Sequence, residues 1–303
     1  MNAVEFSHVS KRFGAQTVLD DLSFDVPEHS VFGFLGQNGA GKTTSMKLLL
    51  GLLEPDGGSI TALGRPVRFS KPVAGIGYLP DVPAFYRYMT PREYLRLCGD
   101  ISGMDRRNIR SRSDELLELV GLKEVRKRIG GFSRGMKQRL GIAQALLDRP
   151  RLLICDEPTS ALDPVGRKEI LDILSQAAAH TTVLFSTHIL SDVERICDQI
   201  AVLHGGRISL AGSMEDIRSR RRQNRLLIDF ADSADRDRFA ALPALRPFLA
   251  DAERTAAGII LTSVDIGCTE RQVLTVLAEQ SLLPVRLEQL EPTLESLFME
   301  AVQ

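Results

Sequence analysis

Residues 36–43 read Gly36-Gln37-Asn38-Gly39-Ala40-Gly41-Lys42-Thr43, which matches the pattern G-x-x-x-x-G-K-[ST]. A short apolar run at residues 30–35 precedes them, and a segment with helical spacing at residues 42–50 follows. A strand, a glycine-rich turn and a helix in this order aim backbone N–H groups and the helix N-terminus at one point, where a phosphate can bind. The sequence therefore predicts a phosphate-binding loop.

The residue types of this loop also predict what each position does. We expect Lys42 to reach the β- and γ-phosphate oxygens of a nucleotide and the Thr43 hydroxyl to coordinate Mg²⁺. The residues expected to bind the nucleotide in and beside the loop are Gly36, Gln37, Asn38, Gly39, Ala40, Gly41, Lys42, Thr43 and Thr44. The alternative is an ordinary glycine-rich turn between a strand and a helix.

An acidic pair closes a second apolar run, Leu152-Leu153-Ile154-Cys155-Asp156-Glu157. Asp156 is expected to hold Mg²⁺ through its water shell, and Glu157 to polarise the water that attacks the γ-phosphate. By itself an Asp-Glu pair at a strand end is more often a helix cap or a solvated turn. Together with the phosphate-binding loop, the catalytic interpretation is favoured.

Strands and helices alternate along most of the chain. Apolar strand-like runs at residues 152–155 and 182–186 alternate with a helix predicted at 164–179. Capping boxes predict two more helix starts, at residues 90–93 and 191–194. This alternation predicts an α/β fold with a mainly parallel sheet.

A change of composition predicts a domain boundary near the C-terminal third of the chain. Residues 218–225 are polar and strongly basic, and we interpret them as a linker after an ATP-binding domain at 1–217. Residues 226–303 contain strand-like and helical segments and are expected to form a small accessory α+β domain. Its last predicted element is an amphipathic helix after Pro292.

The overall composition is that of an ordinary globular protein. Of 303 residues, 44% are hydrophobic and 25% are charged, which excludes disordered, collagen-like and fibrous classes. The formal net charge of −1 gives no overall field that favours nucleic acid or an anionic membrane, although a basic patch could exist locally, and no nucleic-acid partner is expected. We expect no transmembrane segment, because no apolar run approaches the roughly 18 residues that one requires. Residues 1–12 lack the apolar core of a secretory signal, so no signal peptide is expected either.

A third motif opens a predicted helix and reads Phe132-Ser133-Arg134-Gly135-Met136-Lys137-Gln138-Arg139. Here the chain resembles the ATP-binding subunit of an ABC transporter, whose signature loop usually reads Leu-Ser-Gly-Gly-Gln. Ser133 and Gly135 match that loop, whereas Phe132, Arg134 and Met136 depart from it. The resemblance implies that these residues contact the ATP of a second subunit: Ser133, Arg134, Gly135 and Met136. The alternative is a serine that caps an ordinary helix.

Three more segments resemble the family's pattern in the expected order. The D-loop, which crosses the dimer interface in that family, corresponds to Ser160-Ala161-Leu162-Asp163. His188 resembles the switch histidine that contacts the γ-phosphate, so the resemblance implies catalytic roles for Glu157, His188 and Lys42. Phe13 occupies the position of the aromatic residue that stacks on adenine. For Phe13 the alternative is a residue of the hydrophobic core.

One position departs from the family in an informative way. ABC ATPases often carry glutamine after the strand that corresponds to residues 76–79, where its oxygen approaches Mg²⁺, and this chain has Asp81. A carboxylate suits Mg²⁺ but reaches less far than glutamine, so Asp81 is expected to act as a ligand directly or through water. The alternative is a turn residue in Leu-Pro-Asp-Val-Pro, and the two interpretations are evenly matched.

The resemblance implies a whole molecule as well as a site. It predicts a P-loop NTPase with a RecA-like core, an N-terminal antiparallel β subdomain and a helical subdomain at about residues 84–147. ATP and Mg²⁺ would be bound by a homodimer, associated with separate permease subunits at the cytoplasmic face of the membrane. The C-terminal residues 291–298 resemble ATPases of ABC-2-type exporters of antibiotics and other hydrophobic molecules. The alternative function is a soluble ABC-type ATPase in translation or DNA repair.

Overall fold

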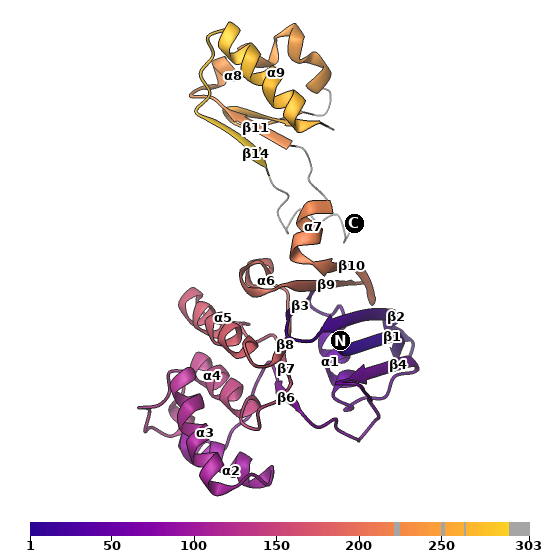
Figure 1. Cartoon of the computed structure of the whole chain (residues 1–303), viewed down its shortest axis with the longest axis vertical. Helices are drawn as coiled ribbons and strands as arrows, with labels where there is room; N and C mark the ends of the chain where they lie inside the picture. The colour runs from indigo at the N-terminus through magenta and orange to yellow at the C-terminus, as the bar shows by residue number, and fades with distance from the viewer. Residues whose placement is uncertain (221–224, 250–251, 264, 291–303) are drawn as a thin grey trace. The chain divides into compact units, whose positions relative to one another are not determined.

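The computed structural model describes residues 1–220, 225–249, 252–263 and 265–290. The chain divides into two compact units, one formed by Met1–Met214 and the other beginning at Glu215 (Figure 1). Within the described residues, no helix has the length and apolar character needed to cross a membrane. All residues predicted to bind or hydrolyse ATP lie in the first unit.

A central sheet forms the core of the first unit. Its strands are β3 (Val31–Gly36), β6 (Ile76–Leu79), β7 (Leu152–Asp156), β8 (Thr182–Thr187), β9 (Gln199–His204) and β10 (Arg207–Ser213). Their spatial order is β10-β9-β3-β8-β7-β6, and all neighbours are parallel except β10 with β9. Every residue of β3, β7 and β8 is buried, as expected for strands covered on both faces. The carboxyl ends of these three neighbouring strands therefore lie at one edge of the sheet.

A smaller antiparallel sheet packs beside the central one. It consists of β1 (Asn2–Phe13), β2 (Gln16–Pro27), β4 (Gly57–Ala62) and β5 (Arg65–Pro66), in the order β2-β1-β4-β5. Stacked rings join the two sheets, because Phe24 of β2 lies 4.6 Å from Phe6 and 5.0 Å from Phe34 of β3, measured between ring centroids. The strand that leads into the phosphate-binding loop is thus fixed by the core of the smaller sheet.

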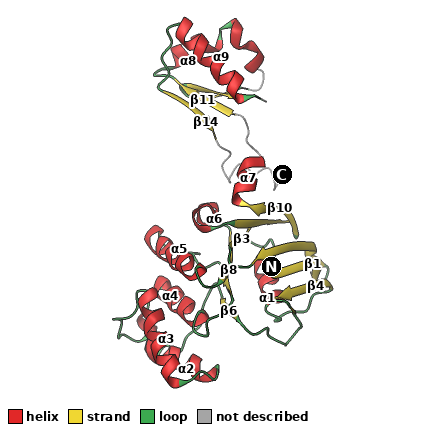
Figure 2. Cartoon of the chain, in the orientation of Figure 1, coloured by secondary structure: helices red, strands yellow, loops and turns green. Residues whose placement is uncertain are grey.

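Helices cover the central sheet, and one of them, α5 (Pro164–Ala178), begins with a side-chain cap. The helices α1 (Lys42–Leu49), α5 (Pro164–Ala178) and α6 (Leu190–Ile196) pack against it. Helix α1 contacts β3, β7 and β4, so it lies between the two sheets, and Figure 2 shows α5 on the other side of the central sheet. Helix α5 begins with Pro164, and Asp163 caps it by accepting a hydrogen bond from the Gly166 amide at 3.2 Å.

The capping box predicted at residues 191–194 is wrong. Helix α6 begins at Leu190, and no side chain caps its first turn. Asp192 is only 1% exposed, and it accepts a hydrogen bond from the Thr159 hydroxyl at 2.6 Å. This tertiary contact explains the error, because the sequence pattern reports only on local capping.

The residues between β6 and β7 form a helical subdomain, as the resemblance implied. It contains α2 (Pro91–Ile101), α3 (Arg106–Leu119), a 3-10 turn at Ile129–Gly131 and α4 (Arg134–Ala145). The capping box predicted for α2 is confirmed, since Glu93 accepts from the Thr90 amide at 2.7 Å and the Thr90 hydroxyl accepts from the Glu93 amide at 3.4 Å. The helical subdomain carries the signature motif at the start of α4.

The second unit has its own sheet and core and is of the predicted α+β type. Its strands are β11 (Arg225–Asp229), β12 (Glu253–Arg254), β13 (Gly258–Thr262) and β14 (Arg286–Leu290), in the antiparallel order β12-β13-β11-β14. Its helical segments are α7 (Met214–Arg220), α8 (Ser233–Ala240), the 3-10 helix Pro243–Phe248 and α9 (Ile266–Glu279). Phe239, Val273 and Ile228 are fully buried in its core.

Two sequence predictions fall wholly or partly outside the described residues. In the linker predicted at 218–225, α7 extends to Arg220 and β11 begins at Arg225, so only the residues between them lack a described conformation. The amphipathic helix predicted after Pro292 lies outside the described residues.

Candidate nucleotide-binding site

The phosphate-binding loop joins the end of β3 to the start of α1 and depends on its glycines. Gly39 and Gly41 have φ values of 82° and 112°, which side chains rarely tolerate. A Cβ atom on Gly41 would also lie 2.7 Å from the Leu19 side chain, and one on Gly36 would lie 2.8 Å from the Leu203 carbonyl oxygen. Gly36 and Gly41 are therefore required by space, and Gly39 by backbone conformation.

The N-terminus of α1 presents amides that the helix itself does not use. Its first internal hydrogen bond runs from the Ser45 amide to the Gly41 carbonyl at 2.9 Å, and no side chain caps the helix. The amides of Lys42, Thr43 and Thr44 precede the first i−4 acceptor, so helix geometry leaves them for another partner. Such an uncapped N-terminus beside positive-φ glycines is a suitable cradle for phosphate oxygens.

Lys42 is buried at the centre of this loop, with 5% of its surface exposed. Its Nζ donates to the carbonyl oxygens of Gly36 at 2.7 Å and of Gln37 at 3.1 Å, and lies 3.0 Å from Glu157 Oε1. These three contacts match the three donors of an ammonium group. Lys42 must therefore exchange at least one of them in order to bind a phosphate.

The two acidic residues at the end of β7 have different environments. Asp156 is 2% exposed and accepts a hydrogen bond from the Ser186 hydroxyl at 2.6 Å. Glu157 has a φ of 49°, and its amide donates to the Ser186 carbonyl at 3.1 Å. A left-handed conformation is uncommon for glutamate, so surrounding contacts such as the hydrogen bond to Ser186 must hold it in place.

The conformation of Glu157 places its carboxylate between two other predicted site residues. Oε1 lies 3.0 Å from Lys42 Nζ, and Oε2 lies 2.9 Å from Nδ1 of His188, which follows β8. The Glu157 side chain is 12% exposed and that of His188 is 40% exposed, so one end of the group reaches solvent. Three residues far apart in the sequence thus form a continuous chain of contacts at the carboxyl edge of the sheet.

The residues predicted to hold Mg²⁺ fit a site that the nucleotide completes. In the part of the chain that the structure describes, no three His, Cys, Asp or Glu side chains are clustered as ligands for a metal. Mg²⁺ commonly keeps several waters and binds one or two protein oxygens plus substrate phosphates. The donor set of Thr43 and Asp156, an exposed hydroxyl and a carboxylate, is of that type.

Asp81 contacts the signature loop of its own chain. Its Oδ1 lies 3.2 Å from Nη2 of Arg134, and its carbonyl accepts a hydrogen bond from the buried Gln138 side chain at 2.6 Å. Burial raises the pKa of Asp81, Arg134 lowers it, and the charges of Asp156 and Glu157 raise it further. Two of the departures from the family pattern, aspartate at 81 and arginine at 134, therefore form one ion pair.

The signature loop and the D-loop lie next to each other. Ser133 caps α4, because its Oγ accepts a hydrogen bond from the Met136 amide at 3.2 Å. A Cβ placed on Gly135 would lie 3.8 Å from the Leu162 side chain of the D-loop, and Ala161 has a φ of 53°. Ser133 as a helix cap was the alternative to a phosphate contact. The structure shows the cap, which leaves the hydroxyl proton available as a donor.

Phe13 lies at the end of β1 and is not a core residue. Its side chain is 48% exposed, and Lys11 Nζ lies 5.6 Å from the ring centroid. An exposed ring at the start of a tight hairpin can stack on a flat ligand, whereas a core phenylalanine could not. The core alternative for Phe13 is therefore wrong.

Comparisons with known proteins agree with this geometry. Residues 19–160 match the protein family described as ABC transporter. Over 304 aligned residues, which cover 99% of this chain and 97% of the relative, the chain is 35% identical to the bacitracin transport ATP-binding protein BcrA of Bacillus licheniformis. The chain belongs to the ABC transporter family.

Two further matches cover a shorter part of this ABC transporter chain. An uncharacterized ABC transporter ATP-binding protein, YxlF of Bacillus subtilis, is 46% identical over 71% of this chain and 72% of its own length. A solved structure titled "Structure of ATP binding subunit of ABC transporter" is 34% identical, covers 72% of this chain and 92% of its own, and has a TM-score of 0.64. The chain is the ATP-binding subunit of an ABC transporter, and it carries the ATPase domain of that family.

The structure of this ABC subunit also adds residues that sequence reasoning missed. Ser186 holds both Asp156, through its hydroxyl, and the Glu157 amide, through its carbonyl. Asp192 anchors Thr159, which lies between Glu157 and the D-loop, and burial raises the pKa of Asp192. Ser186 was visible as the polar end of an apolar strand, but no local pattern signals the contact between Asp192 and Thr159.

Proposed function

We propose that this chain hydrolyses Mg²⁺-ATP between two copies of itself and thereby drives export through separate permease subunits of the ABC-2 type. The observation that carries the hydrolytic part is the position of the Glu157 carboxylate between Lys42 Nζ and His188 Nδ1. The family membership supports ATP as the nucleotide. The site residues are assigned below from their contacts.

A change of hydrogen-bond partners by Lys42 would couple nucleotide binding to activation of Glu157 as the general base. When Lys42 turns to the β- and γ-phosphate oxygens, it gives up its contact with Glu157. The Glu157 carboxylate is then available to accept a proton from an attacking water, while His188 holds its other oxygen. Nucleotide binding and the release of Glu157 are thus one event.

Mg²⁺ would be held by Thr43, by Asp156 and by nucleotide oxygens, and when bound it would neutralise charge on the phosphates. The hydrogen bond from Ser186 fixes the orientation of the Asp156 carboxylate for that role. We assign Asp81 a water-mediated position, because Arg134 occupies its Oδ1. The ring of Phe13 would stack on the adenine.

The signature loop would act on the nucleotide of the second copy. Its capping serine can still donate its hydroxyl proton, and the N-terminus of α4 begins directly after this serine. The D-loop packs on Gly135, so a movement at one is transmitted to the other. ATP would then stabilise the closed pair of subunits and hydrolysis would release it.

A groove beside Asp81 is suited to receive the permease. It is lined by Ala84, Phe85, Tyr86, Tyr94, Leu97, Cys98, Ile101, Ser102 and Gln144. Tyr86 and Ile101 are 53% and 78% exposed, and exposed aromatic and aliphatic residues are typical of the centre of protein interfaces. Docking there would hold this chain at the cytoplasmic face of the membrane as a peripheral subunit.

Export of an antibiotic or a similar hydrophobic molecule is supported by the name of one relative. The protein from Bacillus licheniformis is named for bacitracin transport, and its similarity spans nearly all of both chains. The same similarity disfavours the alternative of an ATPase in translation or DNA repair.

Affinity capture of the tagged chain from detergent-solubilised membranes tests the proposal. We expect the captured complex to contain a permease and to hydrolyse ATP, and reconstituted vesicles to transport cargo only when ATP is supplied. Capture of ribosomal proteins or DNA-repair factors without a permease would contradict the assignment. The variant Glu157→Gln should give the same complex without turnover.

A further inference from the structure

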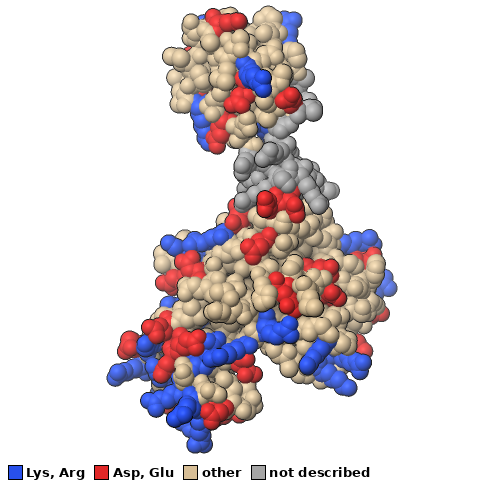
Figure 3. Space-filling view, viewed as in Figure 1, with Lys and Arg blue, Asp and Glu red and all other residues tan. Residues whose placement is uncertain are grey.

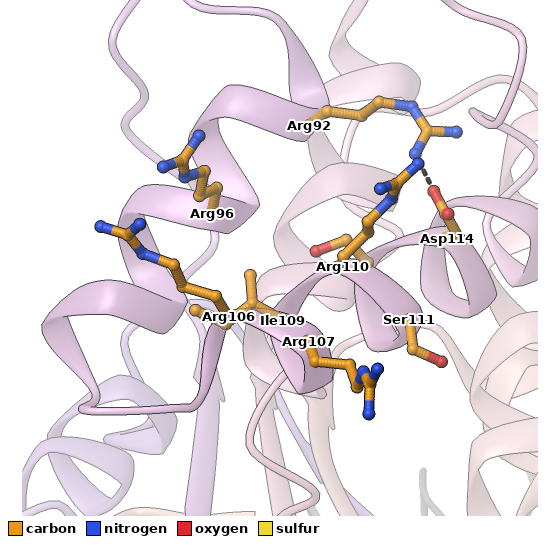
Figure 4. Close-up of a pocket in the computed structure, with 9 residues that line it drawn as sticks. Arg92, Arg96, Arg106, Arg107, Ile109, Arg110, Ser111 and Asp114 are labelled. Carbon is orange, nitrogen blue, oxygen red and sulfur yellow. Dashed lines mark ion pairs between the residues drawn. The ribbon is translucent and has the colours of Figure 1, made fainter.

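A pocket rich in arginine opens on the helical subdomain, away from the residues assigned above. Its volume is about 1080 Å³, and it is lined by Arg92, Arg96, Arg106, Arg107, Ile109, Arg110, Ser111, Ser113 and Asp114. The arginines come from both α2 and α3. In Figure 4, Arg106 extends to the same side as Arg96 and Arg110 lies beside Arg92, whereas Arg107 points away from them. Figure 3 shows many Lys and Arg side chains over this part of the molecule, with Asp and Glu side chains among them.

The acidic groups of the region do not balance these arginines. Asp114 forms an ion pair with Arg92, and Asp100 lies 3.8 Å from Arg96. For the remaining lining arginines of α3, no acidic side chain lies within 4.0 Å among the described residues; these are Arg106, Arg107 and Arg110. Like charges gathered around one pocket repel each other, so an anion that enters is favoured.

The chemistry of the lining points to phosphate groups. Each guanidinium presents a planar fork of donors that matches a phosphate or carboxylate in a bidentate manner. Ile109 is the one apolar residue of the lining, and it is 2% exposed. Five of the nine lining residues are arginine, and this composition favours an anionic ligand.

The position of the pocket on α2 indicates where the phosphate groups come from. Arg92 and Arg96 line the pocket, whereas Leu97 and Ile101 of the same helix line the groove proposed for the permease. If a permease binds this chain at that groove, the arginine pocket lies on the neighbouring face of α2, close to the membrane partner. Anionic lipids attract juxtamembrane Lys and Arg residues by about 1 kcal/mol each.

We infer that this pocket binds the headgroup phosphates of anionic phospholipids. The inference rests on the proposed function, because that function brings the chain to a membrane. Through the pocket the helical subdomain would grip the lipid surface beside the permease. Membrane attachment would then have two components, the permease and the lipid.

Flotation with phospholipid vesicles tests this inference on the full chain. We compare vesicles of phosphatidylcholine alone with vesicles that contain about one third phosphatidylglycerol, and expect binding only to the second. Arg106→Gln with Arg110→Gln should weaken that binding about thirtyfold, since two contacts are lost. Both side chains are exposed, so the fold and the ATPase rate should be unchanged.

The matched control removes the same charge elsewhere. Arg246→Gln with Arg271→Gln lies in the second unit, where both residues are exposed, and should leave flotation unchanged. Equal binding by wild type and the pocket variant would overturn the inference. The inference would also be overturned if the chain did not bind vesicles but its pocket bound inorganic pyrophosphate or a poly-glutamate peptide.

Capture of the permease separates this inference from the proposed function. If the wild-type chain captures a permease but the pocket variant floats as well as wild type, the lipid site alone is wrong. If wild type captures no permease, the proposed function is wrong, whatever the vesicles show.

Discussion

The two halves of the proposed ATP site differ in how much of each is assembled within one chain. On the phosphate-loop side, Lys42, Glu157 and His188 already contact one another at the edge of the central sheet. On the signature side, Ser133 only caps its own helix and Arg134 pairs with Asp81. One half is built by tertiary contacts, and the other awaits a partner that a single chain does not provide.

The difference teaches how the site is regulated. Under the proposed function, a complete site in one chain would hydrolyse ATP without control, whereas a divided site would be active only when two chains meet. Substitution of Lys42 on the phosphate-loop side should therefore impair ATP binding by a single chain. Substitution of Ser133 on the signature side should impair only ATP hydrolysis by the pair.

The largest effect is expected at Glu157. Glu157→Gln keeps the shape of the side chain and its capacity to accept a hydrogen bond from Lys42, but removes the base, so turnover should fall about 10³-fold while ATP binding remains. Steady-state phosphate release and equilibrium ATP binding measure the two quantities. Glu118→Gln, an exposed change on α3, is the control. Undiminished turnover of Glu157→Gln would show that another group is the base.

Loss of Lys42 should act on a single chain through nucleotide binding. Lys42→Ala should weaken ATP affinity about 10- to 100-fold, because a charged hydrogen-bond donor to the phosphates is lost. It should also destabilise the chain by about 1–3 kcal/mol, since the buried Glu157 carboxylate and two carbonyls lose a donor. Lys47→Ala in the same helix removes an exposed lysine and should change neither quantity. Calorimetry and thermal unfolding report on both.

A change at Ser133 sharpens the comparison, because it separates capping from phosphate contact. Aspartate caps helices as well as serine does, so Ser133→Asp should leave the melting temperature of the single chain unchanged. Its negative charge would face the partner's γ-phosphate, and we expect the ATPase rate to fall about thirtyfold while ATP binding to the single chain is retained. An unchanged rate would mean that Ser133 is only a helix cap.

The smallest effect is expected at Asp81. Its ion pair with Arg134 is 44% exposed on both sides, so Asp81→Asn should cost less than about 1 kcal/mol and lower turnover only about threefold. A loss comparable to that of Glu157→Gln would instead identify Asp81 as a direct metal ligand.

The pH dependence of stability offers a second view of Asp81. Because burial raises the pKa of Asp81, the folded chain keeps a proton that the unfolded chain has already released. The free energy of unfolding should therefore decrease as the pH rises from the ordinary aspartate range through the raised pKa. Urea titrations at a series of pH values should show a smaller decrease in Asp81→Asn than in wild type, because buried Asp192, whose pKa is also raised, contributes to the decrease in both. Asp25→Asn, an exposed change on β2, is the matched control.

Much of the phosphate-loop side could be predicted from local sequence. The loop at residues 36–43 and the acidic pair after an apolar strand each depend on neighbours in the sequence, and the structure has the expected strands in place. The Thr90 capping box of the helical subdomain is local in the same way. The resemblance to the ABC transporter family additionally predicted the helical subdomain at about residues 84–147 and the catalytic role of His188.

The remaining contacts could not be predicted, because they join residues far apart in the chain. Asp192 looks like part of a capping box by its spacing, yet its partner is Thr159 on another segment. The pairing of Asp81 with Arg134 is likewise invisible to periodicity or propensity. Polar contacts of this kind, whether buried or exposed, are decided by tertiary packing, which a local pattern does not encode.

The division of the site between two chains is tested most directly by mixing two inactive variants. Lys42→Ala lacks a working phosphate loop and Ser133→Asp lacks a working signature loop, so each alone should be nearly inactive. In mixed pairs, one site combines the intact phosphate loop of one chain with the intact signature loop of the other. We expect an equal mixture to recover roughly a quarter of the wild-type ATPase rate, the share of intact sites in randomly formed two-fold dimers. A mixture no more active than its components would contradict the divided site.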